Sequence, residues 1–183
     1  NQQVDPSAVF VGWPGVMAEL GDRPHERVVL TESYRCPPAV EAAARALFGL
    51  PGADRPLPPG AAHALLRARV HSPFHLVADL ADALDDLLAR DRHATAAVIV
   101  RAPDVARRLH RLLRRALPAR LALGGDFDFR PGVVVTCVDE VKGLEFEVVV
   151  VPDANASTYP DTPESRRALY VAMTRATRQL WLL

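Results

Sequence analysis

Three short segments of this chain carry side chains whose types and spacing could bind phosphate or move protons. They read Ser33-Tyr34-Arg35-Cys36-Pro37, Asp139-Glu140-Val141-Lys142-Gly143-Leu144-Glu145-Phe146 and Arg166-Arg167-Ala168-Leu169-Tyr170-Val171-Ala172-Met173-Thr174-Arg175-Ala176. Arginine is always charged in proteins, and its planar guanidinium can bind two phosphate oxygens at once. Lys142, the only lysine in the chain, lies in the second segment. Arg35 and Arg175 are therefore candidates for contact with an anion.

Each segment also has a structural interpretation that needs no ligand. Arg35 can cap or pair near a helix start. Lys142-Gly143 can end a helix, because glycine adopts the left-handed conformation found there. Arg175 falls in the last turn of its expected helix, where a cation opposes the helix dipole. None of the three segments indicates a ligand on its own. What their side chains can bind depends on the helices and strands that position them.

The rest of the chain alternates strand and helix patterns, which predicts a doubly wound α/β fold: a mainly parallel sheet with helices on both faces. The expected strands are short apolar runs at 28–30, 66–71, 96–100, 121–123, 133–137, 146–151 and 180–183. The expected helices are one turn at 16–20 and longer ones at 37–48, 74–90, 103–116 and 163–176. Thr162-Pro163-Glu164 is typical of an N-cap, a first helical position and an acidic first turn.

The two runs 133–137 and 146–151 are strongly apolar and β-branched, so we expect them to be adjacent central strands. Ligands of open α/β sheets bind at the carboxyl ends of the strands, and we expect the three polar segments there. Arg35 and Arg175 should then lie on one rim, face one exposed cleft, and stay out of any fully buried ion pair.

Composition limits the classes of function. The formal net charge is zero, whereas proteins that bind nucleic acid by themselves are usually basic. No run approaches the ~18 apolar residues of a membrane helix, so we expect a cytoplasmic protein with no membrane partner. Cys36 and Cys137 form no CxxC pair, which favours two reduced thiols over one disulfide and predicts no metal site.

Taken together and in this order, the segments resemble the motifs of one family. L-x-x-S-Y-R-C-P resembles motif IV, V-K-G-L-E-F motif V, and R-R-A-L-Y-V-A-M-T-R-A motif VI of UvrD/Rep-like superfamily 1 DNA helicases. The opening Asn1-Gln2-Gln3-Val4-Asp5 resembles the end of motif III. The chain is thus similar to the second RecA-like motor domain (2A) at 25–183. Residues 1–24 would be the tail of the first motor domain or a linker.

The resemblance implies a RecA-like fold and an ATP site shared between two domains. The first domain, N-terminal in the same polypeptide, would supply the phosphate loop and the Mg²⁺ ligands. The second would supply Arg35 and Arg175 as catalytic arginines. The implied nucleotide-binding residues are Gln2, which senses the γ-phosphate, Lys142, Gly143, and Glu145, which bonds the ribose. The implied nucleic-acid contacts are Tyr34, Thr136 and Asp139.

The sequence lacks the motifs that make an ATP site alone. It contains no G-x-x-x-x-G-K-[ST] and no G-x-G-x-x-G, and Asp139-Glu140 lies inside motif V rather than in a Walker B motif. We therefore expect this chain by itself to bind neither ATP nor Mg²⁺ and to be inactive as an ATPase.

Two departures from the family pattern bear on the substrate. Asp139 stands where the family usually has a histidine that contacts nucleic acid, and an anion is repelled by phosphates. The large accessory domain usually inserted between motifs IV and V is absent, which points to a compact branch.

Three functions remain open. The first is half of an ATP-dependent helicase or translocase on single-stranded DNA. The second is the same kind of ATPase acting on a protein partner such as RNA polymerase, which Asp139 and the neutral charge favour. The third, an unrelated Rossmann-type binding module, is disfavoured because its glycine fingerprint is missing.

Overall fold

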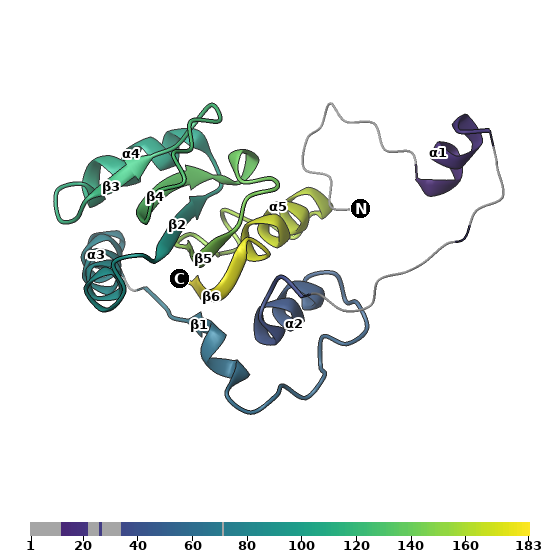
Figure 1. Cartoon of the computed structure of the whole chain (residues 1–183), viewed down its shortest axis with the longest axis horizontal. Helices are drawn as coiled ribbons and strands as arrows, with labels where there is room; N and C mark the ends of the chain where they lie inside the picture. Colours follow the sequence, from purple (N-terminus) through teal and green to yellow (C-terminus); the bar gives the residue numbers. More distant parts are fainter. Residues whose placement is uncertain (1–11, 22–25, 27–33, 71) are drawn as a thin grey trace.

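The structure, a computed structural model, describes residues 12–21, 26, 34–70 and 72–183 (Figure 1). Within them the chain forms one six-stranded sheet in the order β1-β6-β5-β2-β4-β3, and every pair of neighbours is parallel. The strands are β1 (Leu65–Arg67), β2 (Thr95–Val100), β3 (Ala119–Leu121), β4 (Gly132–Cys137), β5 (Phe146–Val151) and β6 (Ala176–Leu182).

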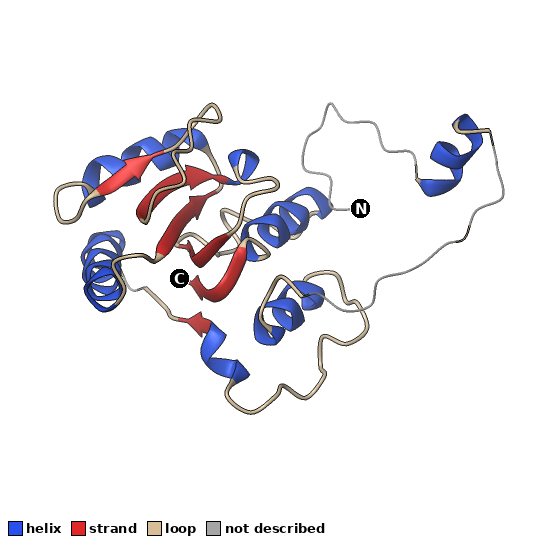
Figure 2. Cartoon of the chain, viewed as in Figure 1, coloured by secondary structure: helices blue, strands red, loops and turns tan. Residues whose placement is uncertain are grey.

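Helices cover both faces of the sheet (Figure 2). Side chains of α2 (Pro38–Ala46) and α5 (Pro163–Met173) pack on one face, and those of α3 (Pro73–Arg90) and α4 (Pro103–Leu113) pack on the other. Successive residues of β2 alternate between the two cores, because side chains of a strand point to opposite faces. A short helix, α1 (Trp13–Glu19), and two 3-10 helices, η1 (Ala61–Ala64) and η2 (Val138–Glu140), complete the elements. The doubly wound α/β fold expected from the sequence is confirmed.

The structure corrects the expectation that the runs 133–137 and 146–151 form adjacent strands. β4 and β5 are both central, but β2 lies between them and pairs with each. An apolar, β-branched run shows that a strand is buried, whereas its lateral neighbours depend on the connections between strands.

Several boundaries also differ. Helix α5 ends at Met173 instead of 176, because Arg175 N bonds to Ala172 O, three residues back, at 3.3 Å and Ala176 already pairs with Phe146 in the sheet. β6 therefore begins at 176 instead of 180, β1 is shorter than the 66–71 run, and β3 lies slightly earlier than 121–123. The expected strand 28–30, Gln2 and the motif III-like opening lie outside the described residues.

Candidate functional site

Glu145 and Arg175 lie side by side at the amino ends of two neighbouring strands. Glu145 directly precedes β5, Arg175 directly precedes β6, and Phe146 N donates to Arg175 O at 2.9 Å. This corrects the expectation that both would lie at the carboxyl ends. The segment 138–145 runs from the carboxyl end of β4 to the amino end of β5, so it leaves Asp139 at one edge and Glu145 at the other.

The segment that contains Arg35 reaches the same edge and touches both of the others. Arg35 Nε forms an ion pair with Glu145 Oε1 at 2.5 Å, and each of the two side chains is 46% exposed. Cys36 Sγ donates to the backbone oxygen of Thr174 at 3.4 Å, across 138 positions of sequence. The contact between Cys36 and Thr174 was not expected from the sequence, since nothing in a one-dimensional pattern shows that these two groups meet.

Arg175 is held by backbone oxygens and is only 6% exposed. Its Nε donates to Val171 O at 3.0 Å, Nη1 to Leu144 O at 3.2 Å, and Nη2 to Thr174 Oγ1 at 3.2 Å. A guanidinium has five N–H donors, so one on each terminal nitrogen is left for a further acceptor. Among the described residues Arg175 forms no ion pair.

The expectation that Arg175 points into an exposed cleft is wrong. Because α5 ends at Met173, Arg175 does not project from a helix. It lies in the turn that enters β6, where its guanidinium covers the last carbonyl groups of the helix. The apolar face expected for α5 is found: Ala172 and Met173 are fully buried and Leu169 is partly buried in the same core.

Charges of both signs influence one another at this edge. Burial lowers the pKa of Arg175, and the positive charge of Arg35 lowers it further, while Glu145 opposes the shift. Burial raises the pKa of Cys36, and the same two arginines act against that change. The guanidinium groups of Arg35 and Arg175 therefore lie close enough to affect each other.

Lys142 and Gly143 form an exposed turn between η2 and β5. Leu144 N donates to Val141 O at 3.1 Å, and Gly143 has a φ of +85°, a left-handed conformation that favours glycine. The glycine is therefore needed for the turn, whatever Lys142 contacts.

The residues expected to contact nucleic acid are scattered. Thr136 is completely buried in β4, so the structure contradicts a direct contact there: helices cover both faces of the sheet, and residues of a central strand face one core or the other. Asp139 is exposed at the carboxyl edge, away from Glu145, and Tyr34, next to Arg35, is 95% exposed. The structure does not bring Tyr34 and Asp139 to one edge of the sheet.

Two further observations concern metals and membranes. The described residues include no group of three or more His, Cys, Asp or Glu side chains that could hold a metal ion. None of the helices in the described part of the chain is long and apolar enough to cross a membrane. Cys36 and Cys137 are free and lie in the cores on opposite faces of the sheet.

The parallel sheet and its arginine–carboxylate edge define the class as a RecA-like α/β domain. Residues 132–183, which include the second and third polar segments, match the family of UvrD-like helicase C-terminal domains. This match confirms the resemblance to UvrD/Rep-like superfamily 1 helicase C-terminal domains that the motifs indicated.

One solved structure supports the similarity in fold. The C-terminal domain of a possible DNA helicase from Lactobacillus plantarum WCFS1 is similar, with a TM-score of 0.62 and 25% identity, over 82% of this chain and 86% of that one. Weaker matches are the Hef helicase domain of Pyrococcus furiosus (TM-score 0.41, 16% identity, 59% of this chain and 25% of that one) and T4 UvsW (0.36, 8%, 64% and 30%). None of the curated proteins matches this chain.

Proposed function

We propose that this chain is the second motor domain of an ATP-dependent superfamily 1 DNA helicase or translocase. It would complete an ATP site whose phosphate loop and Mg²⁺ ligands come from an N-terminal RecA-like domain of the same polypeptide. One observation carries the proposal: Arg35, Glu145 and Arg175, from three distant segments, meet at one edge of the sheet.

Arg175 suits the chemistry of phosphoryl transfer. Charge builds on the oxygens of the transferred group, and fixed positive donors stabilise it without having to reorganise. Three hydrogen bonds already fix the guanidinium of Arg175, and its two remaining N–H groups can bind phosphate oxygens. Lysine lacks this planar arrangement, so it is a poor substitute.

The ion pair between Arg35 and Glu145 would be exchanged when nucleotide binds. Both side chains are about half exposed, and such exposed pairs contribute only about 0.2–1 kcal/mol. A ribose hydroxyl can then donate to Glu145 while Arg35 turns to the γ-phosphate. The pair keeps both groups in place between turnovers at little cost.

A second function, remodelling of a protein partner such as RNA polymerase, is favoured by one feature. Asp139 is exposed at the carboxyl edge, where an anion repels the phosphates of single-stranded DNA, and Thr136 is buried and unable to contact a strand. ATP turnover that single-stranded DNA stimulates, with an effect that falls as salt rises, would support the helicase or translocase. Turnover that is indifferent to DNA would support the remodelling factor.

The test is ATP turnover by the protein in which this chain is joined to its first motor domain. Arg35→Ala and Arg175→Ala should each reduce turnover by about a hundredfold or more. Arg175→Lys should recover little of that loss.

The matched control is Arg108→Ala, which removes another exposed arginine, on α4, paired with Asp104 at 2.9 Å. It should leave turnover unchanged. Circular dichroism would show that each variant is folded at the assay temperature. Normal turnover in a folded Arg175→Ala protein would overturn the proposal.

A further inference from the structure

Two neighbouring helices carry opposite charges on the sides that face solvent. Helices α3 and α4 lie next to each other on one face of the sheet, where their apolar side chains share a core (Figure 1). Three exposed aspartates of α3 form what we call the acidic stripe: Asp79, Asp82 and Asp85. Four exposed arginines of α4 and of the turn that follows it form what we call the basic stripe: Arg107, Arg111, Arg114 and Arg115.

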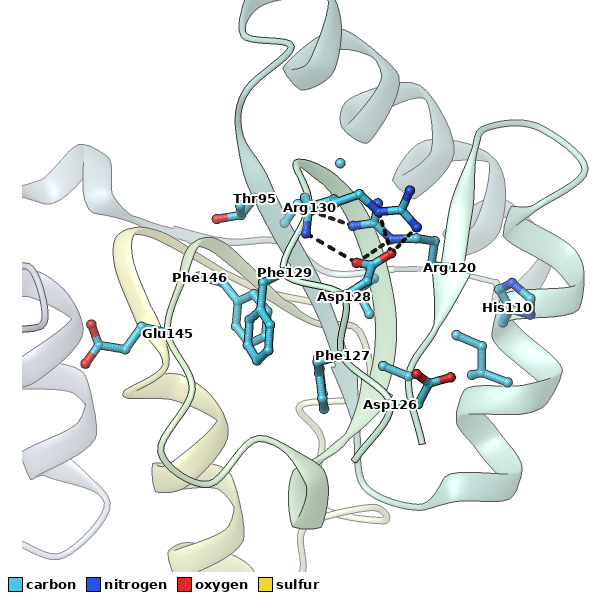
Figure 3. A pocket seen from close by; sticks show the side chains of 15 residues that line it. Thr95, His110, Arg120, Asp126, Phe127, Asp128, Phe129, Arg130, Glu145 and Phe146 are labelled. Carbon is cyan, nitrogen blue, oxygen red and sulfur yellow. Dashed lines mark hydrogen bonds and ion pairs between the residues drawn. The ribbon is translucent and has the colours of Figure 1, made fainter. Parts of the chain in front are cut away.

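Other charged side chains of the two helices already have partners. Asp86 pairs with Arg90 at 3.3 Å, and Arg108 pairs with Asp104 at 2.9 Å. His110 faces the sheet: its Nε2 hydrogen-bonds with a backbone oxygen of β3 at 3.1 Å, and it borders the cavity drawn in Figure 3. By contrast, no member of either stripe forms an ion pair with another described residue.

This arrangement leaves like charges close together on each helix. Residues three or four positions apart are neighbours on a helix surface, so Asp79 repels Asp82 and Arg107 repels Arg111. Aspartate is also a poor residue for the interior of a helix. Both stripes therefore cost the helices that carry them some stability. A surface of opposite charge laid on each stripe would remove the repulsion.

We propose that two copies of this chain form a dimer through the exposed face of α3 and α4, with the acidic stripe of each copy on the basic stripe of the other. The face carries both signs in nearly equal number, so it is complementary to itself. A two-fold symmetric interface brings the same patch of both copies together, and each α3 then faces the α4 of its partner. Leu112, which is 45% exposed on α4, adds an apolar contact among the arginines.

The same observations argue against a nucleic acid on this face. The basic stripe attracts phosphates, but the acidic stripe beside it repels them, and the net charge of the chain is zero. The dimer uses neither Arg35, Glu145 nor Arg175. Its failure and the failure of the proposed function are therefore separate results.

The first measurement is the mass of the 183-residue chain by sedimentation equilibrium. At about 50 mM salt the mass should rise with protein concentration toward twice the 19.9 kDa of one copy. At about 500 mM salt, ions screen the charges, and dimerisation should weaken at least about tenfold. A chain that remains a single copy at about 100 µM in low salt would overturn the proposal.

Charge reversal tests which side chains meet. The first variant reverses the acidic stripe: Asp79→Lys, Asp82→Lys and Asp85→Lys. The second variant reverses most of the basic stripe: Arg107→Glu, Arg111→Glu and Arg115→Glu. Lysine and glutamate are good helix formers, so both variants should fold. Each variant alone has like charges on both helices and should dimerise at least about tenfold more weakly than the parent. Mixed in equal amounts, the two should form a heterodimer with an affinity within about threefold of the parent's, because each contact then joins opposite charges.

A matched control makes the same change in net charge outside α3 and α4, at three exposed or half-exposed arginines: Arg55→Glu, Arg67→Glu and Arg166→Glu. It should leave the affinity of the dimer within about threefold of the parent's. Reversed variants that do not associate when mixed, or a dimer that neither reversal weakens, would show that the stripes do not meet. If the parent is a single copy and the arginine reversal abolishes salt-dependent binding to a DNA duplex, the basic stripe is a nucleic-acid surface and the proposal is wrong.

Discussion

Arg175 is both positively charged and nearly buried. An arginine that serves only as a cation at a helix end would stay in water, yet this one is nearly covered. Its three hydrogen bonds join the end of α5 to Leu144, the residue before Glu145. The same side chain therefore links the end of α5 to the residue before Glu145, and under the proposed function it would also present its charge to a phosphate.

We expect Arg175→Ala to lower the free energy of unfolding by about 1–3 kcal/mol, because it removes three hydrogen bonds, among them the one to Leu144 O. Urea denaturation of this chain measures the change, with Arg108→Ala as the control. A loss below about 0.5 kcal/mol would show that these hydrogen bonds add nothing in solution.

Asp153, which follows β5, is a second residue whose effect on stability should depend on pH. Its Oδ2 accepts from Arg101 N at 3.4 Å, while Oδ1 is buried without a hydrogen-bond partner in the described part of the chain. Burial raises the pKa of this carboxyl above its ordinary value. The folded state thus holds the proton more tightly than the unfolded state, and stability falls as pH rises through the raised pKa.

Asp153→Asn removes the charge at every pH. We expect the variant to be more stable than the parent by about 1 kcal/mol at neutral pH, the scale of one poorly satisfied buried polar group. The difference should shrink below the ordinary pKa of aspartate, where both side chains are neutral. Urea denaturation across this pH range measures it, and a difference that does not vary with pH would contradict the interpretation.

At the scale of elements, α5 sets the position of Arg175 through both of its ends. Thr162 Oγ1 accepts from Ser165 N at 3.2 Å, and Pro163 occupies the first turn. At the other end Thr174 is the last capping residue, and Arg175 N bonds to Ala172 O, three residues back, at 3.3 Å as the chain turns into β6. The N-cap expected from the sequence is confirmed.

Thr162→Ala should therefore destabilise the chain by about 1 kcal/mol, while Thr162→Ser should have little effect. For a chain of this size we expect a fall in Tm of about 2–4 °C, measured by thermal denaturation. An unchanged Tm for the alanine variant would mean that the cap is satisfied by solvent equally well.

At the scale of the whole molecule, two cores lie on opposite faces of the sheet, and helices cover both faces (Figure 1). Arg35 and Glu145 are half exposed at the amino edge of β5 and β6, where the proposed function places contact with the first motor domain. The sequence has no phosphate loop, and the described residues have no metal-binding group.

We expect the 183-residue chain alone to hydrolyse no ATP above background, because it lacks the phosphate loop and the Mg²⁺ ligands. A phosphate-release measurement on the purified chain tests this, with the version joined to its first motor domain as the positive control. Turnover that remains after repeated purification and is lost in Arg175→Ala would contradict the shared site.

The sequence by itself determined the local order of the fold. Alternating helix and strand patterns predicted helices on both faces of a parallel sheet, and the runs at 133–137 and 146–151 correctly indicated buried strands. These features could be predicted because burial and helix starts leave a pattern in neighbouring residues. The three motifs likewise identified the family, since each lies within a few consecutive positions.

Only the tertiary structure decided how these parts meet. It placed β2 between β4 and β5, moved Glu145 and Arg175 to the amino edge, and buried Arg175 beneath carbonyl groups of its own helix and of Leu144. Each outcome depends on contacts between residues far apart in the chain, such as Cys36 with Thr174. The periodicity of apolar residues shows which side of a helix or strand faces the core. The order of strands across the sheet, and the path of the loops between them, depend on packing in three dimensions.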